Sequence, residues 1–101
     1  MRTIITVVLS NCSAQHSQTL NTLMNLEGYL DELIIFHNGV ESIEIDKNFI
    51  YNLELKIKKV SVRHFFDVRP LSWIYNGVLN EYYHGDRFIF FSDDCVLEGN
   101  Y

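Results

Sequence analysis

Apolar and polar positions divide the chain into short strands and amphipathic helices. The run TIITVVL at Thr3–Leu9 is rich in β-branched residues and has no period, which predicts a central strand covered on both faces of a parallel sheet. LIIF within Glu32–His37 predicts a second buried strand, and the pair Asn38–Gly39 favours a turn with positive φ. FIFF within Arg87–Phe91 predicts a further buried strand.

Two segments have the spacing of amphipathic helices. Ala14–Glu27 is predicted as a helix that ends at Gly28, with apolar positions at Leu20, Leu23, Met24 and Leu26. Pro70 opens the clearest helix and Gly85 ends it. The apolar stripe of this second helix consists of Leu71, Ile74, Tyr75, Val78, Leu79 and Tyr82.

The segment between residues 40 and 60 completes the predicted order of strands and helices. Leu53–Val60 alternates apolar and charged residues, which predicts a half-exposed strand at a sheet edge. Val40–Asn52 has no clean period and is assigned as loop, with room for a short helical turn. The order strand, helix, strand, strand, helix, strand predicts a Rossmann-like, mostly parallel sheet with flanking helices in a single domain over residues 1–101.

Composition and net charge limit the classes of molecule that the chain is expected to bind. A chain of 101 residues that is 48% hydrophobic can form one domain with a real core. Its net charge of -5 argues against nucleic acid, but a nucleotide remains compatible because a divalent cation can neutralise its phosphates. No apolar stretch approaches the roughly 18 residues of a membrane span. We expect a cytoplasmic protein in which Cys12 and Cys95 are reduced.

Candidate chemistry lies where strands end. Ligands of parallel sheets bind outside the carboxyl ends of the strands, and polar loops follow there at Ser10–Ser13, His37–Gly39 and Ser92–Cys95. Asp93 and Asp94 offer adjacent hard oxygen ligands that suit Mg²⁺ or Mn²⁺ already held by phosphates. The alternative is an ordinary acidic turn.

Four segments in order resemble family 2 glycosyltransferases. HGDRFIFFSDDCVL resembles the segment in which a Gly-Asp turn leads into an apolar strand and a run of aspartates. ITVVLSNCS resembles the first strand and nucleotide-binding loop, ELIIFHNGV the second strand with its loop, and LSWIYNGVL the Ala-x-Asn helix. Together they span nearly the whole chain. The resemblance implies the nucleotide-sugar-binding half of a GT-A fold.

The resemblance also implies roles for individual residues. The residues that it places at the nucleotide are Ser10, Asn11, Cys12, His37, Asn38, Asn76 and Asp93. Asp94, with Asp93, would hold the Mg²⁺ or Mn²⁺ between the phosphates. Three positions depart from the family pattern: His37 stands in place of an aspartate, Ser10 in place of proline, and Ser92 in place of the first acid of the metal motif.

The family pattern has a second half that binds the acceptor and supplies a catalytic base. No residue here is assigned as that base, so we expect a module that binds a nucleotide-diphospho-sugar, such as a UDP-sugar, and is incomplete as a catalyst. A non-catalytic remnant or interaction module with the same fold is the alternative. A phosphate-accepting receiver ranks last, because the first loop has no acid.

Two further hypotheses concern the remaining side chains. Cys12, His37 and Cys95 would bind a soft metal if they met at one edge, although cysteines of this kind are more often small buried hydrophobes. In a domain without its second half, exposed aromatic rings favour self-association, so we expect a homo-oligomer or a companion chain. The rings concerned are Phe65, Phe66, Trp73, Tyr82 and Tyr83.

Overall fold

The computed structural model describes residues 2–10, 12–26, 30–39, 45–82 and 85–97. Strands and helices alternate along the chain, which confirms the predicted α/β, Rossmann-like class. The strands are β1 (Thr3–Leu9), β2 (Leu30–Asn38), β3 (Ile57–Phe65) and β4 (Arg87–Phe91). The helices are the 3-10 turn η1 (Ala14–His16), α1 (Gln18–Leu23), α2 (Lys47–Lys56) and α3 (Leu71–Glu81).

All strand pairs in the described sheet are parallel, and the strand order is β3-β2-β1-β4. β1 is therefore central, as its unbroken apolar run predicts. The chain adds β2 and then β3 on one side of β1 and crosses over to place β4 on the other. This reversal of direction puts the carboxyl ends of β1 and β4 at the position where such sheets open a crevice.

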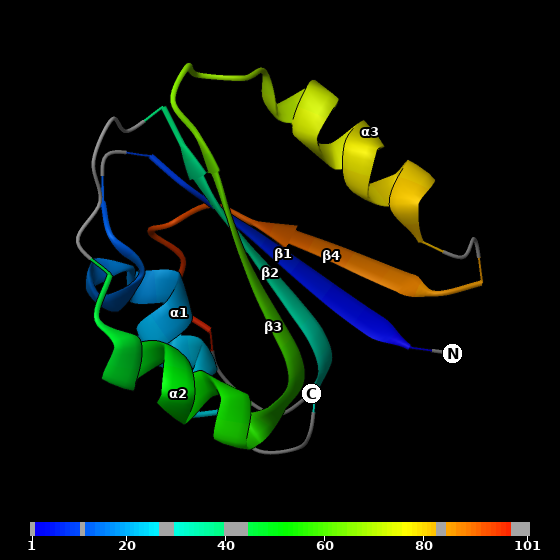
Figure 1. Cartoon of the computed structure of the whole chain (residues 1–101). Coiled ribbons are helices and arrows are strands. Elements are labelled where there is room, and N and C mark those ends of the chain that lie inside the picture. Colours follow the sequence, from blue (N-terminus) through cyan, green and yellow to red (C-terminus); the bar gives the residue numbers. More distant parts are fainter. Residues whose placement is uncertain (1, 11, 27–29, 40–44, 83–84, 98–101) are drawn as a thin grey trace.

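Helices cover both faces of the sheet (Figure 1). On one face α1 and α2 bury Leu20, Leu23 and Leu53 against the sheet. On the other face Ile74 and Val78 of α3 pack against β1 and β2. Alternate strand residues supply the two cores, so each buried strand must be apolar at successive positions.

The first predicted helix is shorter than expected. Ser17 interrupts Ala14–Glu27, separating η1 from α1, and its hydroxyl accepts a hydrogen bond from the N–H of Leu20 as an N-cap. α1 ends at Leu23, and residues 27–29 lie outside the described part.

The prediction for Leu53–Val60 was partly wrong. Residues up to Lys56 belong to α2, and the edge strand runs instead from Ile57 to Phe65. Leu53 is fully buried as the inward residue of α2, while Leu55 is 67% exposed, so the apparent alternation reflects a helix with a narrow apolar side.

The last two elements fall close to their predicted bounds. Pro70 is the N-cap of α3, although only Ile74 and Val78 of its predicted stripe are fully buried. β4 has the predicted bounds, but it is an edge strand whose residues are half-buried or exposed. The prediction of a buried β4 was therefore wrong, since FIFF has no neighbouring strand on one side within the described residues.

Candidate functional site

The loops after β1 and β4 meet at the carboxyl edge of the sheet. The carboxylate of Asp93 accepts hydrogen bonds from the backbone N–H of Ser10 at 3.2 Å and from the thiol of Cys12 at 3.4 Å. The predicted convergence of these two loops is thereby confirmed. β1 and β4 are parallel neighbours, so their carboxyl ends lie side by side. Residues more than 80 positions apart in the sequence therefore come into contact there.

The turn after β4 is also fixed to the start of α1. The carbonyl oxygen of Asp93 accepts hydrogen bonds from the N–H of Thr19 at 3.2 Å and the hydroxyl of Ser17 at 3.0 Å. The N–H of Cys95 donates to the hydroxyl of Thr19 at 2.8 Å. Sequence reasoning missed Ser17 and Thr19 as site residues, although a serine before an apolar helical run is a recognisable N-cap signal.

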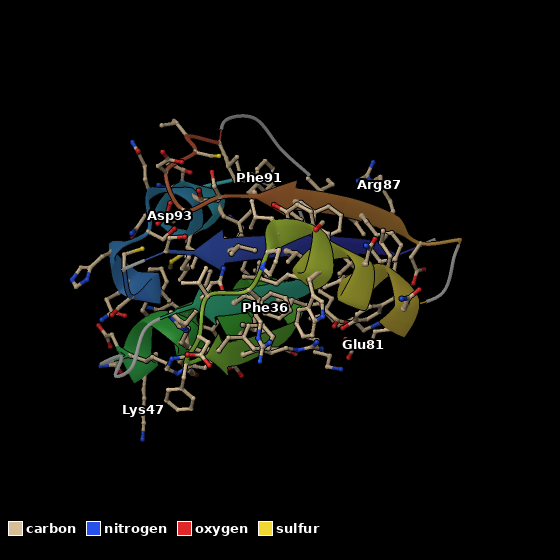
Figure 2. All side chains as sticks on the ribbon, turned by 90° about the horizontal axis from the view of Figure 1, so that it is seen from above. Phe36, Lys47, Glu81, Arg87, Phe91 and Asp93 are labelled. Carbon is tan, nitrogen blue, oxygen red and sulfur yellow. The ribbon has the colours of Figure 1, made fainter. Side chains whose placement is uncertain are left out.

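Asp93 and Asp94 have different surroundings. Asp93 is half-buried in the turn just described, whereas Asp94 is exposed and accepts a hydrogen bond from the hydroxyl of Ser92 at 2.9 Å (Figure 2 labels Asp93 and the end of β4). Ser92 therefore orients the Asp94 carboxylate. Of the two acids, Asp94 is the one whose carboxylate remains open to solvent ligands.

The Cys12 thiol is a hydrogen-bond donor and a poor nucleophile. Burial raises its pKa to about 11, with further contributions from the hydrogen bond to Asp93 and the charge of that carboxylate. A thiol in this state remains protonated at neutral pH. Within the described residues, no three or more His, Cys, Asp or Glu side chains cluster closely enough to hold a metal, so the soft-metal hypothesis for Cys12, His37 and Cys95 gains no support.

His37 lies near the carboxyl end of β2, next to Leu9 at the end of β1. Its side chain is fully buried, and neither ring nitrogen has a hydrogen-bond partner among the described residues. The His64 ring on β3 packs against it edge to face at a centroid distance of 6.1 Å. Burial, and then the charge of His64, lowers the pKa of His37, so the ring is held neutral.

Asn38 fixes the loop that leads into α3. Its amide oxygen accepts from the N–H of Arg69 at 2.8 Å, and its amide nitrogen donates to the Arg69 carbonyl at 3.0 Å. The predicted positive φ follows at Gly39, where φ is 84° and a Cβ atom would lie only 2.3 Å from Val68 Cγ2. Both Asn38 and Gly39 thus have structural roles in the turn.

Asn76, the remaining predicted residue that the structure describes, is not part of this cluster. Asn76 is exposed on α3, two positions from both buried residues, Ile74 and Val78, and therefore on the outer side of the helix. Asn11 lies outside the described residues. The structure thus unites Ser10, Cys12, Asp93 and Asp94 and leaves Asn76 apart from them.

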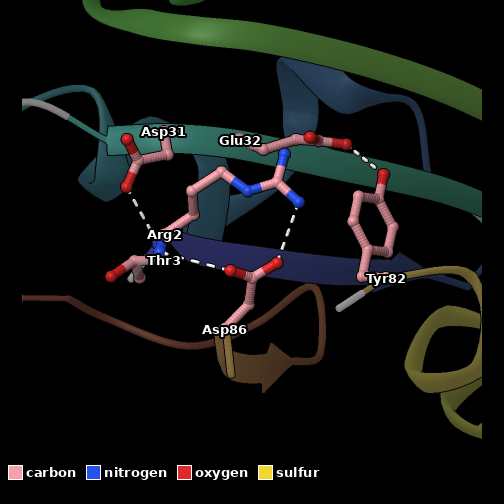
Figure 3. A network of polar contacts seen from close by, with 6 residues as sticks. All are labelled: Arg2, Thr3, Asp31, Glu32, Tyr82 and Asp86. Atoms are coloured by element: carbon pink, nitrogen blue, oxygen red, sulfur yellow. Dashed lines mark hydrogen bonds and ion pairs between the residues drawn. The ribbon is translucent and has the colours of Figure 1, made fainter. Parts of the chain in front are cut away.

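A second polar network lies at the opposite, amino edge of the sheet (Figure 3). Arg2 pairs with Asp86 at 2.8 Å, Asp31 accepts from the N–H of Thr3 at 2.9 Å, and the buried Glu32 accepts from the hydroxyl of Tyr82. A shallow hollow beside it is lined by Arg2, Asp31, Glu32, Lys58 and Lys59. Its acids are already satisfied by the fold, so we interpret this network as structural.

The fold and the carboxyl-edge site define an α/β protein with a Rossmann-like parallel sheet and an acidic turn at its switch point. No protein-family model matches the chain, and searches of curated proteins and of solved structures also give no match. None of the helices in the described part is long and apolar enough to cross a membrane.

Proposed function

We propose that the chain binds the nucleotide-diphosphate part of a sugar donor through Mg²⁺ or Mn²⁺, as a glycosyltransferase-like module. The observation that carries the proposal is the contact of Asp93 with Ser10 and Cys12, which fixes the acidic turn to the loop after β1, while the adjacent Asp94 is exposed. Mg²⁺ and its relatives are commonly held by one or two carboxylates together with substrate phosphates. Two acids at this turn are sufficient for such a metal.

Roles within the proposed site follow from burial and bonding. Asp94 contacts the metal, Asp93 holds the two loops together, and the loop around Ser10 and Cys12 borders the nucleotide. The buried His37 supports this edge from below, and Asn38 reaches the nucleotide only by releasing Arg69. The two free cysteines fit a cytoplasmic location, where thiols stay reduced.

We assign no catalytic base, so the proposal concerns donor binding. Glycosyl transfer additionally requires an acceptor site and a base, to which we assign no residue of the described part of the chain; we propose a companion chain or a second copy as their source. Exposed apolar side chains near the start of α3 support such an assembly: Phe66, Val68, Leu71 and Trp73.

A non-catalytic interaction module is the second candidate. The observation in its favour is that Asn38, Asp93 and His37 are committed to the fold by hydrogen bonds or burial. Under this interpretation, the loops that resemble the glycosyltransferase pattern stabilise the sheet edge and do not bind a nucleotide.

Calorimetric titration with uridine diphosphate, with and without Mn²⁺, separates the two candidates. The donor module predicts binding that requires Mn²⁺ and that weakens at least about tenfold in Asp94→Ala, which removes a charged ligand worth more than about 1.4 kcal/mol. Asp67→Ala, which removes an exposed acid from the β3–α3 loop, is the matched control and should leave binding unchanged.

A failure to bind uridine, guanosine or adenosine diphosphate at millimolar concentration with Mn²⁺ would favour the interaction module. Equal affinity of the wild type and Asp94→Ala for the nucleotide in the presence of Mn²⁺ would show that Asp94 does not bind the metal.

A further inference from the structure

The two edges of the sheet are chemically different. β3 carries Lys58, Lys59 and Arg63 along its length, and such charges discourage another strand from pairing. β4 has one charge, Arg87, at its start and is then entirely apolar through Phe91. Its apolar residues are only half-buried. Within the described residues, the β4 edge therefore lacks the usual protection against strand addition.

The backbone of β4 presents unpaired groups on its outer side. The N–H of Arg87 donates to the carbonyl of Arg2 at 2.8 Å. In the parallel register, the backbone N–H and C=O groups of the odd-numbered residues of β4 therefore point toward β1. The N–H and C=O of Phe88 and Phe90 consequently face away from the sheet. In the described part of the chain, no strand lies beside them.

The neighbouring elements that the structure describes leave room at this edge. After the turn, the N–H groups of Cys95 and Leu97 bond to Thr19 and Thr22 of α1, so the chain leaves β4 toward the α1 face. The buried residues of α3 pack over β1 and β2. Figure 2 shows β4 at one margin of the sheet, with α3 lying inward of it.

We propose that a second copy of this chain pairs antiparallel with β4 about a twofold axis at Ile89. Two four-stranded sheets would join into one continuous sheet. The axis places Phe88 opposite the partner's Phe90, so the outward N–H and C=O groups of each pair exchange hydrogen bonds. This interface uses the free edge and does not depend on nucleotide binding.

The sequence of β4 is complementary to itself in this arrangement. Phe-Ile-Phe at Phe88–Phe90 reads the same in both directions, so aromatic rings meet on the α3 face and isoleucines meet on the other. Arg87 lies opposite the partner's Phe91, next to the acidic turn of Asp93 and Asp94 that follows it, which gives an attraction of opposite charges between the copies. These features favour a second copy over an unrelated strand.

Sedimentation equilibrium of the whole chain, wild type against Phe90→Pro, tests the interface. Proline is tolerated in an edge strand where its missing N–H would face solvent, and circular dichroism checks that the monomer keeps its fold despite the lost contact of the Phe90 ring with Tyr75. The dimer loses two hydrogen bonds, and its dissociation constant should rise about 30-fold. Phe90→Leu keeps the N–H and is the matched control, which should retain the dimer.

Two further measurements decide the result even if Phe90→Pro does not fold. Arg87→Glu should weaken the dimer by placing an acid next to the partner's acidic turn at Asp93 and Asp94, and the effect should diminish in high salt. Amide hydrogen exchange should show protection of Phe88 and Phe90 that increases with protein concentration.

The proposal is overturned by a monomer at several hundred micromolar. It also fails if amide protection is independent of concentration, or if Trp73→Ser dissociates the dimer while Arg87→Glu does not. Uridine diphosphate binding measured in parallel shows whether donor binding succeeds or fails independently of dimerisation.

Discussion

At the scale of single residues, His37 is the most unusual group in the described part of the chain. A buried polar side chain is normally hydrogen-bonded, and one without partners reduces stability. The neutral ring tolerates this position beside His64, but the protonated ring would carry an uncompensated charge in an apolar layer. The residue should therefore make stability sensitive to pH.

We predict that the free energy of unfolding falls as the pH is lowered below 6.5, the ordinary pKa of histidine. The folded-state pKa of His37 is lowered, so the unfolded chain binds the proton first and is stabilised, by at most about 1.4 kcal/mol per pH unit. Urea unfolding at several pH values should show a smaller slope for His37→Leu. The exposed His16→Gln should keep the wild-type slope, and an unchanged slope in His37→Leu would contradict the prediction.

At the scale of elements, α2 shows how a cap can decide between helix and strand. The side chain of Asp46 accepts hydrogen bonds from the N–H groups of Asn48 at 3.0 Å and Phe49 at 3.4 Å. This cap satisfies otherwise unpaired donors and starts the helix at Lys47. The weak apolar periodicity of Lys47–Lys56 alone does not reveal a helix.

Replacing Asp46 by alanine should lower the free energy of unfolding by about 1 kcal/mol, within the range of about 0.5–2 kcal/mol for lost N-caps. Glu54→Ala alters an exposed acid of the same helix and should change stability by less than about 0.5 kcal/mol. Thermal unfolding of the two variants compares them directly. Equal losses would mean that the cap does not determine the helix.

At the scale of the whole molecule, polar contacts attach the last turn of α3 to the sheet. Glu81 forms two hydrogen bonds to Arg63, at 2.6 and 2.7 Å, and the Tyr82 hydroxyl donates to Glu32 of β2. Glu32 is only 3% exposed, and burial raises the pKa of Tyr82, keeping it a donor. Few side chains of α3 are buried, so these contacts help to position it.

Tyr82→Phe removes the donor and leaves the Glu32 carboxylate without that partner. We expect a loss of about 1–3 kcal/mol in the free energy of unfolding, typical for a bond to a buried charged group. Tyr75→Phe, on the same helix, is the comparison and should cost less than about 0.5 kcal/mol. Denaturant unfolding that finds both variants equally stable would refute a role for this contact.

The carboxyl-edge site was predictable in part, because parallel topology places the ends of β1 and β4 together. Polar residues directly after the predicted strands were therefore expected at the carboxyl edge of the sheet, and this identified Ser10, Cys12, Asp93 and Asp94 from the sequence. Asn76 was placed by motif likeness, and its exposure depends on which two residues of α3 are buried. Ser17 and Thr19 contact the turn after β4 only through the fold.

The pattern of apolar positions by itself predicted the parallel α/β class, the central position of β1 and the bounds of β4. Those features are local, since a strand covered on both faces must be apolar at successive positions. The sequence did not reveal the start of β3, the burial of His37 or the position of β4 at the edge of the described sheet. Only the tertiary structure decided these, because each depends on which neighbour, if any, lies beside a residue in space.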